Sequence, residues 1–190
     1  MTDWGPLSPA PDGRGRSRPL LVLTSRIIET IAFTGKLIAV VTLSFMFVAL
    51  LANVILRYWF DGGIAWAYEV HAVLLPWLVA AGILVAASRG TNIAITILPD
   101  ALPAGARRIL LVAIEAVIIL ISVSVLLSSQ PILKASQFQT LSTLGIKQIW
   151  GYASLVYAFA GMAVISALEI LRILAGASVF EADYENRSLS

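Results

Sequence analysis

The chain has no cysteine, only one histidine and few charged residues. Of its 190 residues 13% are charged and 59% are hydrophobic, whereas soluble domains average roughly 25% and 45–50%. Without cysteine it can form no disulfide, thiolate metal site or iron–sulfur cluster, and His71 alone cannot provide two-histidine haem ligation. It also lacks a phosphate-binding glycine loop and a serine–histidine–acid set. We therefore expect neither a soluble enzyme nor a bound cofactor, and the net charge of +2 is too small to indicate nucleic-acid binding.

Long apolar runs dominate the rest of the sequence. Charged residues are absent from four stretches: Leu37–Leu56, Val70–Ser88, Ala116–Leu133 and Gln148–Leu168. About 20 helical residues cross the ~30 Å hydrocarbon core of a bilayer, so each stretch is long enough. A soluble helix would need a polar face, which the first stretch lacks. The sequence thus predicts an all-α integral membrane protein with four transmembrane helices, at about 34–57, 66–88, 109–133 and 148–171.

The basic residues predict the orientation of these spans. With four spans, both chain ends and the middle loop share one side, which holds ten of the 13 Lys and Arg residues. The opposite side holds three, namely Arg57, Lys134 and Lys147. The positive-inside rule then places both termini in the cytoplasm, an N-in/C-in topology. We expect a disordered cytoplasmic tail at 1–23, a membrane domain at 24–174, a short amphipathic segment between helices 2 and 3, and a cytoplasmic tail at 175–190.

Polar residues within the third span are candidates for ion handling. Glu115, Ser122 and Ser129 follow one another at seven-residue steps and therefore share one helix face. One interpretation is an autonomous small transporter or channel that uses Glu115. The favoured interpretation is that Glu115 faces the bundle or a partner subunit, because one carboxylate and two hydroxyls make a poor cation cage. A membrane enzyme or redox subunit would have only Glu69, His71 and Glu115 to work with.

The connection between the first two spans carries a second polar group. Asn53 and Arg57 lie four residues apart on the last turn of span one, and Glu69 opens span two. We expect an Arg57–Glu69 ion pair that clamps this hairpin, with contact to an external partner as the alternative. Exposed ion pairs contribute little stability, so such a clamp would mainly fix geometry.

Small residues mark a packing face on the fourth span. Gly151, Ser154, Ala158 and Gly161 recur at helical spacing, and such seams allow another helix to approach closely in a membrane. The sequence leaves open whether that helix belongs to this chain. Secondary transporters usually show repeated halves and broken helices at mid-membrane, and neither is visible here.

The order of several short motifs resembles a known family. The chain reads Asn53-Val-Ile-Leu-Arg57 followed by aromatic residues, then Trp66-Ala-Tyr-Glu69, then Arg89-Gly90, and Leu102-Pro103 before two arginines. This pattern is similar to the small permease subunit of tripartite ATP-independent periplasmic (TRAP) transporters, the DctQ-type family. The chain departs from the family at Asn92–Thr96, where a His-Ile-x-Val-Asp segment is common, and at Gly145-Ile146-Lys147, where Gly-Ile-Pro is common.

The resemblance implies a role in the bacterial inner membrane beside other proteins. In such systems a periplasmic solute-binding protein delivers an organic acid to a large permease subunit, which moves it with a sodium gradient. The small subunit would act as a scaffold for the large subunit, in contact with membrane lipid, and help to dock the binding protein. Asn53, Arg57, Trp66 and Glu69 would be motif positions that shape the outer hairpin, and none would be catalytic.

Overall fold

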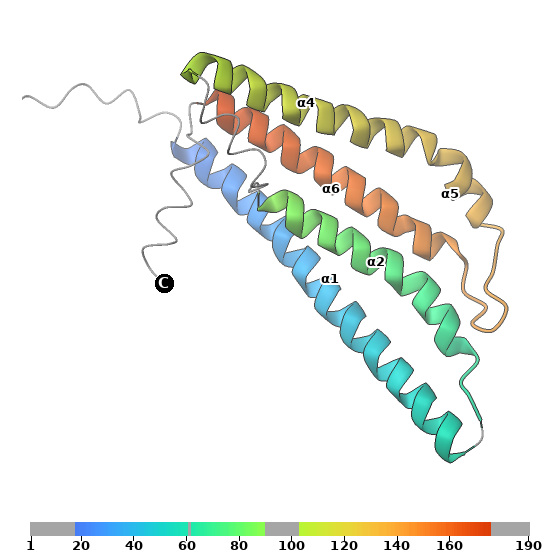
Figure 1. Cartoon of the computed structure of the whole chain (residues 1–190). Helices are drawn as coiled ribbons and strands as arrows, with labels where there is room; N and C mark the ends of the chain where they lie inside the picture. Colours follow the sequence, from blue (N-terminus) through green and yellow to red (C-terminus); the bar gives the residue numbers. More distant parts are fainter. Residues whose placement is uncertain (1–17, 61, 90–102, 176–190) are drawn as a thin grey trace, which may run out of the picture.

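A computed structural model describes residues 18–60, 62–89 and 103–175 of the chain (Figure 1). Its helices are α1 (Arg18–Trp59), α2 (Trp66–Ser88), α4 (Ala104–Ser128), α5 (Gln130–Ser136) and α6 (Ile149–Leu174). Four helical stretches are long and apolar enough to cross a membrane, counting α4 and α5 as one. The predicted all-helical fold with four spans is therefore confirmed. The expected amphipathic segment between helices 2 and 3 and most of both tails fall outside the described residues.

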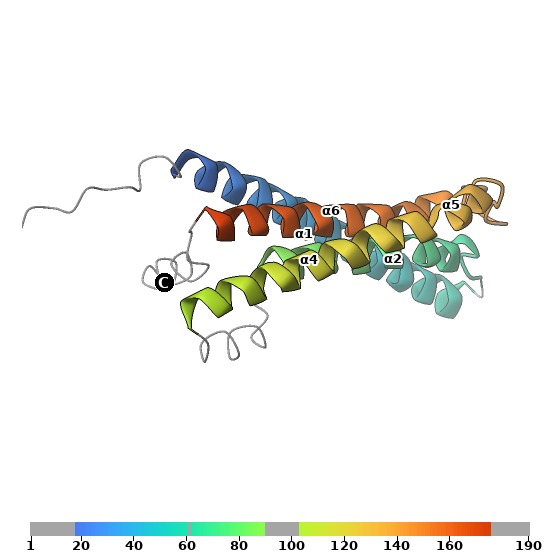
Figure 2. The ribbon, with the colours of Figure 1, turned by 90° about the horizontal axis from the view of Figure 1, so that it is seen from above.

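The helices form an open array rather than a closed bundle. Their order in space is α1, α2, α6, α4, so that α6 lies between α2 and α4 (Figures 1 and 2). The two edge helices, α1 and α4, each pack mainly on one neighbour. The end with the α1–α2 and α5–α6 connections is called the hairpin end below. The opposite end, where α1 begins and α6 ends, is called the terminal end.

Glycines allow α1 and α6 to approach α2 closely. A Cβ atom on Gly161 of α6 would lie 2.6 Å from Leu84 Cδ2 of α2, and Leu84 is fully buried. A Cβ on Gly35 of α1 would lie 3.1 Å from the Ala81 carbonyl oxygen of α2. These helices pack through backbone surfaces, as membrane helices do when lipid tails offer no hydrophobic drive for association.

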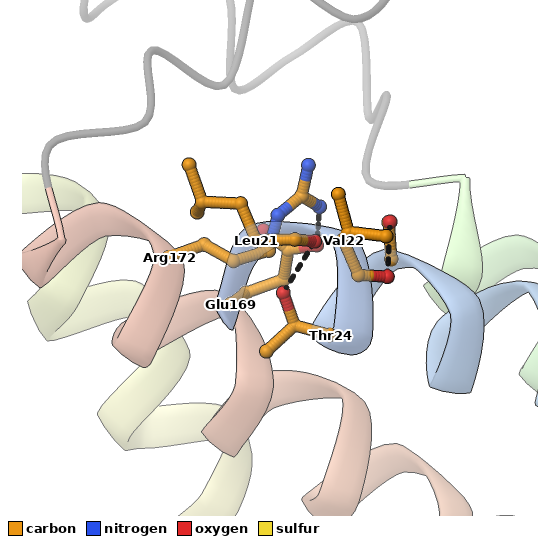
Figure 3. A network of polar contacts seen from close by, with 6 residues as sticks. Leu21, Val22, Thr24, Glu169 and Arg172 are labelled. Carbon is orange, nitrogen blue, oxygen red and sulfur yellow. Dashed lines mark hydrogen bonds and ion pairs between the residues drawn. The ribbon is translucent and has the colours of Figure 1, made fainter. Parts of the chain in front are cut away.

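Helix α1 is longer than the predicted first span. Its 42 residues make it about 63 Å long, roughly twice the hydrocarbon core. It begins at Arg18, so residues 18–23 are helical and do not belong to the disordered tail expected there. Its first turns lie beside the end of α6, where Arg172 Nη1 and Glu169 Oε1 form a 2.6 Å ion pair close to Leu21 and Thr24 (Figure 3).

The third span also extends past its predicted limits. It begins at Ala104 and, after a break at Ser129, continues as α5 to Ser136. Pro131, in the first turn of α5, has no N–H to donate to the Leu127 carbonyl. The proline thus explains why this span is divided into two helices.

Candidate functional site

Asn53 orders the connection between α1 and α2 at the hairpin end. It is a buried polar residue in the next-to-last turn of α1. Its Oδ1 accepts a 2.6 Å hydrogen bond from the Ile64 N–H, eleven residues further along the chain. This bond satisfies a backbone donor just before α2 begins and fixes the loop relative to α1.

Glu69 connects α2 to the loop between α5 and α6. Its carboxylate accepts hydrogen bonds from the Thr143 N–H at 3.0 and 2.9 Å, from the Thr143 hydroxyl at 3.0 Å and from the Leu144 N–H at 2.9 Å. The prediction of an ion pair between Arg57 and Glu69 was wrong, because among the described residues Glu69 forms no ion pair. Two backbone amides and a hydroxyl satisfy the carboxylate in place of the arginine.

The α5–α6 loop is itself ordered as a small antiparallel turn. Thr140 and Lys147 form an isolated β-bridge, and the Leu141 N–H donates to the Ile146 carbonyl at 2.9 Å. Gly145 has φ +63°, a left-handed conformation that glycine adopts without steric cost. Thr143 and Leu144, at the tip of this turn, were not identified from the sequence. Gly145 was the local sequence signal of a turn, but it does not indicate that the turn binds the carboxylate of Glu69.

The end of α1 presents a cation and aromatic side chains. Arg57 is exposed, and Tyr58, Trp59 and Phe60 are 82%, 82% and 71% exposed. Trp66, at the start of α2, is also exposed. Arginine, tyrosine and tryptophan are the residue types that most often dominate binding at protein interfaces. The hairpin end therefore combines ordered loop backbone with exposed arginine and aromatic side chains.

The seam of small residues on α6 faces α2 of the same chain. Gly151 lies against the backbone of Val73, and Gly161 against Leu84. Ser154 and Ala158 are each 2% exposed, and the Ser154 hydroxyl donates a 2.6 Å hydrogen bond to the Gly151 carbonyl. The structure thus assigns this seam to an internal helix contact.

A tryptophan strengthens the same contact between α2 and α6. The Trp77 Nε1–H donates a 2.8 Å bond to the Trp150 carbonyl, and its ring lies 5.7 Å from that of Tyr157. The Tyr157 hydroxyl in turn lies 2.9 Å from Thr34 Oγ1 of α1. Three helices are therefore joined by polar contacts from aromatic side chains.

The polar face of α4 contacts α6. Glu115 is half-buried and lies near Ser166 of α6. Ser122 and Ser129 are buried, but each hydroxyl donates to a carbonyl of its own helix, Ile118 at 2.8 Å and Leu126 at 3.0 Å. Within the described parts of the chain, no three His, Asp or Glu residues gather as metal ligands would. Both hydroxyls are thus bonded within their own helix, whereas Glu115 lies near a polar side chain of α6.

These features define a class: a multi-pass, all-helical membrane protein whose ordered polar groups hold helices and loops in place. The family of "Tripartite ATP-independent periplasmic transporters, DctQ component" matches residues 46–176, more than half of the chain. The chain therefore belongs to the DctQ family, the small permease subunits of TRAP transporters, which confirms the resemblance seen in its motifs. It is a component of a bacterial transporter and not an enzyme.

A sequence relative agrees with this family. Over 119 residues the chain is 23% identical to a protein of Haemophilus influenzae described as a TRAP transporter small permease protein. The aligned residues make up 63% of this chain and 72% of that protein. A tripartite system includes two further components, a large permease and a periplasmic binding protein.

Proposed function

We propose that this chain is the scaffold subunit that holds the large permease in the membrane and contributes its hairpin end to docking of the solute-binding protein. The complex would take up an organic acid with an ion gradient. The observation that carries the proposal is the open array, whose edge helices present apolar side chains that none of the described helices covers. Large exposed examples are Phe33 and Phe47 of α1 and Leu120 and Leu127 of α4.

The pattern along α1 supports an intermolecular role for its uncovered face. Its buried residues recur at three-, four- and seven-residue steps, as in a helix that packs along one side: Ile28, Ala32, Gly35, Thr42, Ala49 and Asn53. In lipid, helices associate through close packing and polar contacts, so a second subunit can pack on the other side of α1.

The alternative of an autonomous transporter loses its main support. It needs Glu115 and the two serines to form an ion path, but both hydroxyls donate to carbonyls of their own helix and Glu115 lies near Ser166 of α6. We therefore assign the serines to α4 itself and Glu115 to the contact between α4 and α6.

A photo-cross-linking amino acid placed at Phe47 or Leu120 tests the scaffold role. Illumination of native membranes is expected to join the chain to the large permease from at least one of these edge positions. The control is the same pair of variants in cells without the large permease, where this adduct should be missing. Recovery of the tagged, unmodified chain from native membranes without any large multispan partner would contradict the proposal.

Single cysteines test the proposed topology, because the natural chain has none. Gly62→Cys lies at the hairpin end, and Gly105→Cys lies at the terminal end, where an added Cβ meets no atom within 4 Å. We expect a membrane-impermeant maleimide to label Gly62→Cys in cells with a permeabilised outer membrane, and Gly105→Cys only after the inner membrane is opened. The reverse labelling pattern would show that the termini face the periplasm.

A further inference from the structure

A groove lies between α1 and α2 near the terminal end. Its volume is about 550 Å³. Small apolar side chains and two cations line it: Lys36, Ala39 and Val40 from α1, and Gly82, Val85, Ala86 and Arg89 from α2. None of these residues belongs to the hairpin end, and Arg89 is the one among them that belongs to the motifs of the family resemblance.

The shape of the groove follows from how the two helices touch. They meet at Gly35, where an added Cβ would lie 3.1 Å from the Ala81 carbonyl oxygen and 3.1 Å from Val85 Cγ2. Beside this contact the helix surfaces separate, and an added Cβ on Gly82 would meet no atom within 4 Å. The groove therefore has an open apolar floor wide enough for a hydrocarbon chain.

Among the described residues, no acidic side chain pairs with either cation of the groove. Lys36 and Arg89 are exposed, and within the described residues neither side chain forms an ion pair or a hydrogen bond. Helical side chains lean toward the N-terminus of their helix, so Lys36 of α1 leans toward the terminal end, where Arg89 follows α2. A lysine in a membrane-crossing helix is costly unless it reaches the interface or finds a counter-ion.

We propose that this groove binds one anionic phospholipid, with the phosphate held by Lys36 and Arg89 and one acyl chain lying over Gly82 and Ala86. Charge complementarity selects an anionic head group, and the apolar floor selects a ligand that carries a hydrocarbon chain. The lipid comes from the leaflet at the terminal end. That leaflet is the cytoplasmic one if the proposed topology holds, but the binding itself does not depend on the topology.

Native mass spectrometry of the full-length chain in detergent tests the proposal, with phosphatidylglycerol compared with phosphatidylcholine of the same acyl chains. We expect one tightly bound phosphatidylglycerol. Lys36→Gln and Arg89→Gln should each weaken its binding about fivefold, and the double variant about 30-fold. Arg26→Gln removes a cation of α1 that does not line the groove and should leave binding unchanged. Equal binding of both lipids, or an equal loss in Arg26→Gln, would overturn the proposal.

Filling the groove separates lipid binding from attraction of a free phosphate. Gly82→Leu keeps both cations but occupies the floor, so it should weaken phosphatidylglycerol binding at least tenfold, whereas Gly105→Leu should not. Free glycerol phosphate, even in excess, should fail to displace the lipid, because it lacks the acyl chain. Displacement at equimolar glycerol phosphate, or unchanged binding by Gly82→Leu, would show that the cations alone make the site.

A photo-reactive side chain at Val40 identifies the occupant in native membranes without altering either cation. A phospholipid adduct on the chain supports the proposal. An adduct with a polypeptide would overturn it, because the groove would then be a contact with another subunit. This outcome is separate from the scaffold role, which is tested at Phe47 and Leu120.

Discussion

Replacing Glu69 by alanine is expected to reduce solute uptake by the assembled transporter about tenfold while the subunit remains in the complex. The variant removes the acceptor for the Thr143 and Leu144 N–H groups, and hydrogen bonds to charged groups are stronger than neutral ones. The α5–α6 loop would then lose its attachment to α2. Amide exchange at Thr143 and Leu144 should become about tenfold faster, and uptake by proteoliposomes that hold all three components gives the functional readout.

Two variants make the Glu69 experiment decisive. Glu69→Gln keeps one carbonyl oxygen as an acceptor and should show a smaller change in both measurements. Glu29→Ala removes an exposed carboxylate of α1 at the other end of the array and should change neither. Faster exchange with normal uptake would mean that the loop does not take part in docking. Unchanged exchange would mean that the loop is held by other contacts.

Gly161→Leu is expected to separate α2 from α6 and to lower the free energy of unfolding by about 3 kcal/mol, the upper part of the range for overpacking. Even the first added carbon would lie 2.6 Å from Leu84 Cδ2, Leu84 is fully buried, and a leucine side chain adds three further carbons. The gain from removing a helical glycine is only about 1 kcal/mol and cannot offset this clash. Thermal unfolding of the purified chain in detergent, followed by circular dichroism, measures the effect.

A second substitution tests whether the clash is the cause. Leu84→Ala combined with Gly161→Leu exchanges the large and small partners and should recover much of the lost stability, so the two changes should be strongly non-additive. Gly82→Leu is the control on α2, since its added side chain meets open space. Additive losses in the double variant would contradict the proposed contact.

The charge-free stretches predicted the helix bounds well for two of the four spans. The predicted span at 66–88 agrees with α2, and that at 148–171 with α6 to within a turn. The start of α1 was missed because hydropathy detects the part of a helix that crosses lipid. Arg26 and Glu29 interrupt an apolar run without interrupting a helix, since both are good helix formers.

The polar groups of the hairpin end were recognised from the sequence, but their partners were not. The motif pointed to Asn53 and Glu69, and the nearest opposite charge suggested Arg57 as the partner of Glu69. The actual partners, Thr143 and Leu144, are 74 and 75 residues away. They reach Glu69 only because α6 packs beside α2, and a carboxylate accepts from a backbone N–H as readily as from a guanidinium. The spacing of residues within the α1–α2 hairpin does not reveal that α6 packs beside α2.

The place of α6 in the array has a consequence for biosynthesis. The ribosome completes α1 and α2 as an adjacent pair, but α4 leaves the translocon before its main neighbour has been made. The third span therefore lacks its packing partner until α6, the last helix of the chain with 26 residues, inserts between α4 and α2. A nascent chain released before α6 would leave α4 as a lone helix beside a two-helix hairpin, a state open to membrane quality-control proteases.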